Sequence, residues 1–318
     1  MIKIVALDGY TLNPGDLSWE NIGKLGTLEV YNRSTITQAQ ERAKDTEVLI
    51  VNKYIIDRDF LDYCKDLRLI CISATGYNNV DIKACKKRGI RVCNVAGYST
   101  TGVVQHTFAM LLHWMNSIGR HSSLVKKGYW SICPDFSFTA NPIHELAGKK
   151  FGVLGYGDIG SQVANVAYAF GMEVQVCRRS NIPLDQTEFE KVDIDTLWST
   201  SDVISLHASL NDASKEIVNE KSLAQMKKSA ILINTSRGGL INENHLAECL
   251  RNEGIQAALL DVLVDEPAKL QHPLYELANC KITPHMAWAS VQSRERCMAT
   301  VCKNISAYLN SKPQNIIV

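Results

Sequence analysis

The sequence has little net charge, no long apolar run and no closely paired cysteines. Its 34 Lys and Arg residues nearly balance its 33 Asp and Glu residues, which gives a formal net charge of +1. A chain so close to neutral lacks the basic field that nucleic acids and anionic membranes attract, so we expect neither as a partner. No stretch approaches the ~20 apolar residues that span a bilayer, and no secretory signal is recognisable at the N-terminus. We therefore expect a cytoplasmic protein.

The ten cysteines include no Cys-x-x-Cys pair. Zinc sites need clustered ligands, and disulfide scaffolds are typical of short secreted chains. Several of the cysteines lie inside apolar runs, as Cys71 does, where a thiol behaves as a small hydrophobe. We expect reduced thiols and no metal site.

What the chain does have is a regular alternation of Val- and Ile-rich runs with amphipathic stretches. Such alternation predicts strands joined by helices, in mostly parallel sheets with right-handed crossovers. In the first hundred residues the expected strands are 2–7, 28–31, 48–51, 69–73 and 91–94, and the expected helices include 37–45 and 80–88. Farther on we expect a long apolar helix over 100–115, an irregular segment over 127–142 and an amphipathic helix over 290–309.

A new strand-helix series begins in mid-chain at Phe151, and its first turn is rich in glycine. The turn reads Gly155-Tyr156-Gly157-Asp158-Ile159-Gly160 and is followed by a helix and by an apolar run over 173–177. In a dinucleotide-binding fold, such glycines allow a tight turn, a close approach to the pyrophosphate and close packing of helix on strand. The pattern predicts a dinucleotide site, with incidental glycines as the alternative. A carboxylate at Asp158 has no evident role beside a pyrophosphate.

The residues after the second strand of this series bear on the choice of cofactor. They are Arg178-Arg179-Ser180, where an NAD site usually has an Asp or Glu for the ribose hydroxyls. Because arginine pairs well with phosphate, we expect NADP to be preferred over NAD. The alternative is that both arginines lie in a solvated loop.

Three residues in the second half each follow a short apolar run: Arg237, Glu266 and His285. A guanidinium can hold a carboxylate and polarise a carbonyl, an imidazole can deliver a proton, and a carboxylate can keep that imidazole protonated. This is the set that reduction of a 2-oxo acid needs. Singly, each residue has a plain alternative, as a surface charge or a turn residue, but together they would gather where open α/β sheets bind ligands.

Several segments, in the same order along the chain, resemble the D-isomer-specific 2-hydroxyacid dehydrogenases. They are the loop 74–81, the glycine loop 155–160, the strand end 206–211 and the runs around Arg237, Glu266 and His285. The opening 7–19 and the run 284–290 are similar to those of the glycerate dehydrogenases (hydroxypyruvate reductases) within that family.

The resemblance implies NAD(P)H-dependent reduction of a small 2-oxo acid, with hydroxypyruvate or glyoxylate as the expected substrate, to the D-2-hydroxy acid. Two alternatives stay open: a dehydrogenase for another 2-hydroxy acid, and a dinucleotide-sensing binding protein on the same fold.

The resemblance also implies roles for single residues. Arg237 would bind the carboxylate and carbonyl oxygen of the substrate, and His285 would donate the proton. Glu266 would hold His285 and stabilise its charged form. Thr75 and Gly76, in the first lobe, would complete the carboxylate cradle.

Further residues are expected around the substrate and the cofactor. Trp288 would wall a small substrate pocket or pack between lobes, and the role of Lys53 is open. The positions expected to border the cofactor outside the glycine loop and 178–180 are His207, Thr235, Ser236, Arg237, Asp261 and His285.

The expected fold class is α/β with two lobes, a Rossmann-type doubly wound parallel sheet and a flavodoxin-like substrate lobe. The substrate lobe would comprise 1–98 and 290–318, and the dinucleotide lobe 99–289. The region 99–145 has more apolar surface than one lobe needs. In the resembling family this region packs against a second subunit, so a homodimer is expected.

Overall fold

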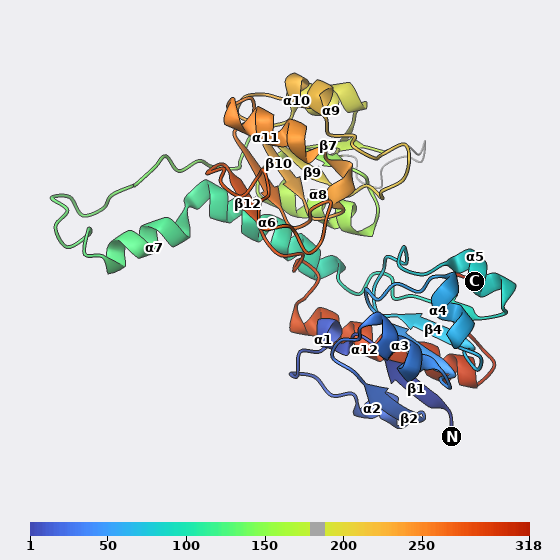
Figure 1. The fold of residues 1–318 in the computed structure, drawn as a ribbon. Coiled ribbons are helices and arrows are strands. Elements are labelled where there is room, and N and C mark those ends of the chain that lie inside the picture. The colour runs from blue at the N-terminus through green and yellow to red at the C-terminus, as the bar shows by residue number, and fades with distance from the viewer. Residues whose placement is uncertain (179–187) are drawn as a thin grey trace. The chain divides into compact units, whose positions relative to one another are not determined.

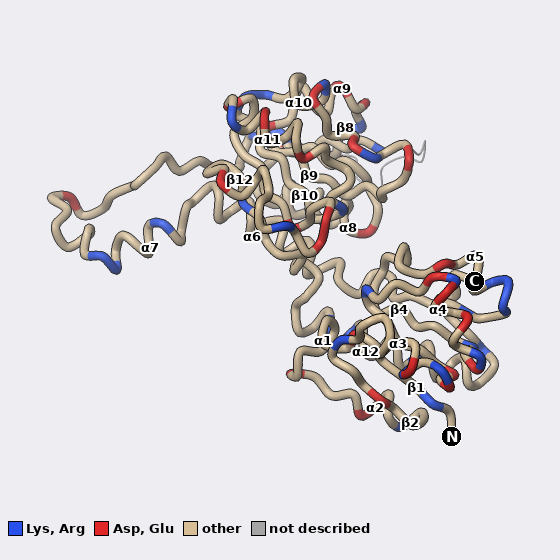
Figure 2. The backbone as a smooth tube through the Cα atoms, in the orientation of Figure 1, with Lys and Arg blue, Asp and Glu red and all other residues tan. Residues whose placement is uncertain are grey.

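The computed structural model describes residues 1–178 and 188–318, in which the chain forms two compact units. Unit 1 comprises Met1–Ser99 with Trp288–Val318, and unit 2 comprises Thr100–Ala287. Each unit has its own sheet covered by helices (Figure 1). Basic and acidic residues are interspersed along the backbone of both (Figure 2). That unit 1 binds the substrate and unit 2 the dinucleotide stays a prediction.

Unit 1 is built on a five-stranded parallel sheet with the order β2-β1-β3-β4-β5, the order of flavodoxin-like folds. Its strands are β1 Lys3–Ala6, β2 Thr27–Val30, β3 Val48–Val51, β4 Leu69–Ile72 and β5 Arg91–Cys93. Its helices are α1 Gly9–Leu12, α2 Glu20–Gly23, α3 Ile36–Ala43, α4 Arg58–Tyr63, α5 Ile82–Lys87 and α12 Val291–Leu309. Strands β3 and β4 are buried along their whole length because separate apolar clusters cover the two faces of the sheet.

Unit 2 is built on a seven-stranded parallel sheet with the order β12-β11-β10-β9-β6-β7-β8. Its strands are β6 Lys150–Leu154, β7 Glu173–Cys177, β8 Glu190–Lys191, β9 Val203–Leu206, β10 Ile231–Asn234, β11 Ala257–Leu260 and β12 Cys280–Ile282. Its helices are α6 Thr100–Asn116, α7 Ile118–Lys126, α8 Asp158–Ala169, α9 Ile194–Thr200, α10 Glu220–Gln225 and α11 Glu243–Arg251, with a short 3₁₀ turn, η1, at Gly238–Leu240.

The direction of strand order changes between β6 and β9 of unit 2. From β6 the chain adds β7 and then β8 on one side, and from β9 it adds β10, β11 and β12 on the other. Ligands of open α/β sheets bind at such a switch point, beyond the carboxyl ends of the strands. The glycine loop follows β6 directly and therefore lies at this point.

The expected fold class is confirmed, since both sheets are parallel and doubly covered. The expected strands and helices of the first hundred residues are also confirmed, to within two residues at their ends. In the described part of the chain, no helix is long and apolar enough to cross a membrane.

One helix, α7, was not expected. It follows Ser117, which has a left-handed backbone (φ 47°) and makes no side-chain cap, and it buries none of its residues. Neither a capping residue nor a buried stripe therefore marks it in the sequence. Figure 1 shows α7 and the segment after it extending away from the sheet of unit 2.

Candidate active site

The three candidate catalytic residues lie at one edge of the unit 2 sheet. Arg237 follows β10, Glu266 follows β11 and His285 follows β12, and these three strands are neighbours in the sheet. Because the strands are parallel, the loops after them emerge at the same edge. The topology thus brings together residues that are far apart in the sequence.

His285 and Glu266 form a direct pair. Nδ1 of His285 lies 2.6 Å from Oε2 of Glu266, and the N–H of Leu263 donates to the other oxygen of Glu266 at 3.1 Å. With Nδ1 facing a carboxylate, it carries the proton of the hydrogen bond, and Nε2 is the nitrogen that can meet a substrate. The pair has the geometry of an acid-base group with an orienting carboxylate.

Hydrogen bonds from neighbouring residues stabilise the loop that carries Arg237. The side-chain amide of Asn234 donates to the Arg237 carbonyl at 2.9 Å, and its oxygen accepts from the Ser236 N–H at 3.0 Å. The Ser236 hydroxyl donates to the Ala208 carbonyl at 2.9 Å, which ties the loop to the end of β9. Asn234 is fully buried, and its side chain stabilises from inside the loop that carries the guanidinium.

Asp261 holds the loop that carries His285. Its carboxylate accepts from the Thr283 hydroxyl at 2.6 Å and from the N–H groups of Met286 and Ala287 at 2.9 and 2.8 Å. Burial raises the pKa of this carboxyl, but hydrogen bonds from His106, Thr283 and those two N–H groups outweigh it and lower the pKa overall. The expectation that Asp261 borders the cofactor stays a prediction, and in the structure the carboxylate is bonded to the loop that follows β12.

His106 and Thr283 are two of the supporting residues to which the sequence assigned no role. His106 Nε2, from α6, lies 3.0 Å from the Thr283 hydroxyl and 3.4 Å from Asp261. Thr283 is adjacent in the sequence to Pro284-His285, which was the only available signal for it. Thr235 also faces α6, where its hydroxyl lies 3.3 Å from that of Thr107.

The glycine loop has the space and the backbone shape that a dinucleotide requires. Gly155 has φ +94°, and a Cβ there would lie 2.7 Å from the Ala208 nitrogen. A Cβ at Gly160 would lie 2.1 Å from the Gly155 carbonyl oxygen, whereas one at Gly157 would meet nothing within 4 Å. The first and third glycines are thus needed for packing, and the open position at Gly157 fits close approach of a pyrophosphate.

The start of α8 also suits an anion. Gly157 is the N-cap and provides no side-chain bond, so the first-turn amides can serve a ligand. Asp158, whose role the sequence left open, is exposed and is the first residue of α8. A carboxylate there is favoured by the helix dipole and need not face the pyrophosphate.

Two other parts of the expected cofactor site are described. The Arg178 guanidinium lies 5.6 Å from the centre of the Tyr156 ring, a cation-π distance. Arg179 and Ser180 lie outside the described residues. His207, beyond β9, has Nε2 2.8 Å from the Ser205 hydroxyl, and burial lowers the pKa of its imidazole to about 4.

The remaining expected substrate residues belong to unit 1. The Thr75 hydroxyl donates to the Val95 carbonyl at 2.9 Å, and Gly76 is the next residue of this loop after β4. Trp288 packs edge-on against Tyr98, with ring centres 6.4 Å apart. The N–H of Lys53 donates to the Asp8 carboxylate at 2.6 Å, as do the N–H groups on either side of it.

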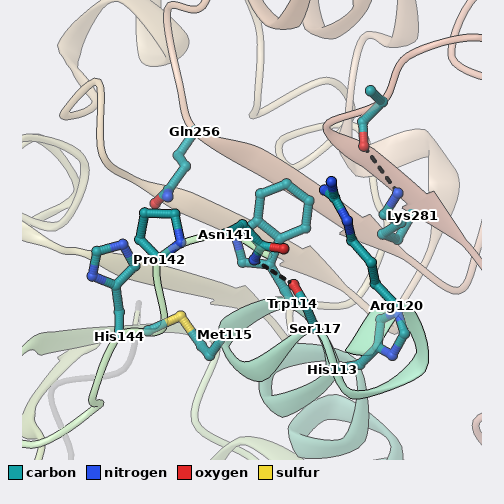
Figure 3. A pocket seen from close by; sticks show the side chains of 11 residues that line it. His113, Trp114, Met115, Ser117, Arg120, Asn141, Pro142, His144, Gln256 and Lys281 are labelled. Carbon is teal, nitrogen blue, oxygen red and sulfur yellow. Dashed lines mark hydrogen bonds between the residues drawn. The ribbon is translucent and has the colours of Figure 1, made fainter. Parts of the chain in front are cut away.

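A cavity of about 440 Å³ lies at the other edge of the unit 2 sheet (Figure 3). Gln256 directly precedes β11, and Lys281 lies within β12. The other lining residues include Trp114 and Met115 of α6 and Arg120 of α7. This cavity is therefore remote from the carboxyl ends of the strands, where the candidate catalytic residues lie.

Comparison with known proteins shows which proteins the chain is similar to. Residues 108–287 match the model of the NAD-binding domain of D-isomer-specific 2-hydroxyacid dehydrogenases. The chain is 39% identical to the hydroxypyruvate reductase of Blautia hydrogenotrophica over 99% of both chains, and 35% identical to the glycerate dehydrogenase of Methylorubrum extorquens over 87% of both. Among solved structures, an acyclic imino acid reductase in complex with NADPH and D-Arg is similar over 100% of both chains, with a TM-score of 0.85 and 33% identity.

Proposed function

Because this chain belongs to the D-isomer-specific 2-hydroxyacid dehydrogenases, we propose that the 2-oxo acid it reduces is hydroxypyruvate, with glyoxylate as a smaller second substrate. It is an NAD(P)-dependent enzyme that reduces 2-oxo acids to D-2-hydroxy acids. The observation that carries the proposal is the His285–Glu266 contact of 2.6 Å, which joins the loops after β12 and β11 beside the loop after β10 that carries Arg237. Relatives named for hydroxypyruvate, glycerate and glyoxylate support the choice of substrate.

In the proposed mechanism Arg237 binds the substrate carboxylate and the carbonyl oxygen. The guanidinium orients the carbonyl and stabilises the negative charge that grows on its oxygen. The reduced nicotinamide supplies the hydride when it is bound. His285 donates a proton from Nε2 to the carbonyl oxygen, while Glu266 holds the ring through Nδ1 and stabilises its charged form. In the oxidative direction the same nitrogen accepts the proton.

We further infer that NADPH is preferred over NADH. After β7 the chain continues Arg178-Arg179-Ser180, with no carboxylate to receive the ribose hydroxyls. Arg178 lies over Tyr156 of the glycine loop, which supports a place beside the adenosine ribose. An Arg178→Ser variant is then expected to lose kcat/KM with NADPH by about tenfold and to keep its kcat/KM with NADH.

Steady-state reduction of hydroxypyruvate, glyoxylate and pyruvate, with NADPH and NADH in parallel, tests the proposed function. Loss of reduced-cofactor absorbance should be fastest with hydroxypyruvate, and the product should be D-glycerate. Faster turnover with NADH would keep the enzyme and refute the cofactor inference. Cofactor binding with no turnover on any 2-oxo acid would favour a dinucleotide-sensing protein on this fold.

We also propose that the chain forms a homodimer through about 99–145. Helix α7 buries none of its own residues, and apolar side chains along residues 127–142, the arm that follows it, are largely exposed. Ile132 and Phe136, for example, are 81% and 91% exposed. Apolar surface of this kind supports an interface with a second copy of the chain.

A further inference from the structure

A half-buried acid-base pair beside the candidate site has no role in the mechanism above. Its members are Glu243, the first residue of α11, and His272, in the segment between β11 and β12. Their side chains are only 16% and 9% exposed, respectively. Nε2 of His272 donates to Oε2 of Glu243 at 3.2 Å, while Nδ1 accepts from the Leu274 N–H at 3.4 Å. These two bonds place the imidazole proton on Nε2 and fix the direction of the carboxylate.

The second oxygen of Glu243 reaches the loop that carries Glu266. Oε1 of Glu243 accepts from the Val264 N–H at 2.8 Å. The preceding N–H, that of Leu263, donates to Oε1 of Glu266 at 3.1 Å. Since Oε2 of Glu266 contacts His285, the backbone of Leu263 and Val264 links Glu243 to the proposed proton donor.

The same peptide also supports the loop of Arg237. A Cβ at Gly238, the residue after Arg237, would lie 2.0 Å from the Leu263 carbonyl carbon and 2.4 Å from the Val264 nitrogen. Two backbone segments in such close contact cannot shift independently of each other. The position of the Leu263–Val264 peptide therefore affects both Glu266 and Arg237.

We propose that Glu243, oriented by His272, is a positioning residue for the reduction. Its carboxylate anchors the Leu263–Val264 peptide and thereby holds Glu266 against His285 and Gly238 beside Arg237. This inference rests on the function proposed for Arg237, Glu266 and His285. Glu243 lies after β10 and not in the glycine loop after β6, so its loss should reduce kcat and leave the affinity for NADPH unchanged.

Three variants test the role of the carboxylate, with Glu248 of the same helix as a matched exposed control. Glu243→Ala should lower kcat for hydroxypyruvate by about tenfold, because small displacements of catalytic groups cost rate steeply. Glu243→Gln keeps an oxygen for the Val264 N–H and should stay within about threefold of wild type. Glu248→Ala should match wild type. A Glu243→Ala enzyme with wild-type kcat would overturn the proposal.

A double-variant comparison separates positioning from a general loss of stability. Because Glu243 acts through Glu266, its loss should matter less once Glu266 is gone. The factor by which Glu243→Ala lowers kcat should be about threefold smaller in a Glu266→Ala background than in wild type. An equal loss in both backgrounds would show that Glu243 does not act through Glu266 and would refute the proposed path.

Amide hydrogen exchange tests the anchor without catalysis. Exchange at Leu263 and Val264 should be faster in Glu243→Ala than in wild type or Glu248→Ala, because the bond from Val264 is lost. Unchanged exchange would overturn the anchor. If wild type reduces no 2-oxo acid yet exchange rises as expected, the proposed function fails while the anchor itself stands.

Discussion

At the scale of single residues, His207 combines a place beside the glycine loop with a neutral ring. A Cβ at Gly155 would lie within 2.8 Å of the His207 carbonyl, so the two segments are packed against each other. Burial lowers the pKa of the imidazole from 6.5 to about 4. The ring is therefore uncharged at neutral pH and adds no positive charge to the cofactor loop.

This lowered pKa gives a signed prediction for stability. Between pH 6.5 and about pH 4 the unfolded chain binds the proton and the folded chain does not, so the free energy of unfolding falls as the pH falls. Above that window both states are neutral and the effect vanishes. Wild type should lose about 3 kcal/mol more than His207→Gln on going from neutral pH to about pH 4. Urea denaturation of both proteins across this range measures the difference, and parallel curves would contradict the prediction.

At the scale of elements, the β6–α8 turn contains two positions that need glycine for different physical reasons. Gly155 has a left-handed backbone and contacts the end of β9, whereas Gly157 is open on the side where a Cβ would lie. A substitution at Gly155 should therefore destabilise the fold, whereas one at Gly157 should mainly weaken ligand binding.

Gly155→Ala is expected to cost about 3 kcal/mol of stability, from backbone strain and overlap with Ala208. Gly157→Ala should cost less than about 1 kcal/mol, yet raise the Kd for NADPH by about tenfold because its methyl occupies the pyrophosphate approach. Thermal unfolding and fluorescence titration measure the two quantities. Equal stability losses in both variants would show that this division of roles is wrong.

The order of elements was predictable from the sequence, and so was much of the candidate site. Fully apolar runs such as 48–51 and 69–72 belong to strands buried on both faces, and parallel strands put Arg237, Glu266 and His285 at one edge. Helix α7 could not be predicted, because its apolar side chains form no buried stripe within one chain.

Contacts that support the site from a distance were also beyond the sequence. His106 meets Thr283 across 177 positions, and Glu243 meets His272 across 29. Neither pair has a local spacing that signals contact, because sheet topology and loop paths bring its members together. Local patterns therefore indicated the candidate catalytic residues and did not indicate the residues that hold them in place.

At the scale of the whole molecule, the exposed arm predicts assembly. Wild type should have twice the 35.4 kDa mass of one chain in light scattering, because Ile132 and Phe136 expose apolar area that a second copy can cover. A double Ile132→Ser, Phe136→Ser variant should shift toward the single-chain mass. Leu270→Ser, at a position 98% exposed outside the arm, is the control and should stay dimeric. A wild-type mass of one chain would refute the dimer.

We propose above all that this molecule reduces hydroxypyruvate with Arg237 polarising the carbonyl. The most direct test measures kcat/KM for hydroxypyruvate, and the Kd for NADPH, in wild type and Arg237→Ala. We predict D-glycerate formation by wild type, a loss of about a hundredfold or more in the variant, and a Kd for NADPH that changes by less than about threefold. No turnover by wild type, or a variant as active as wild type, would contradict the account.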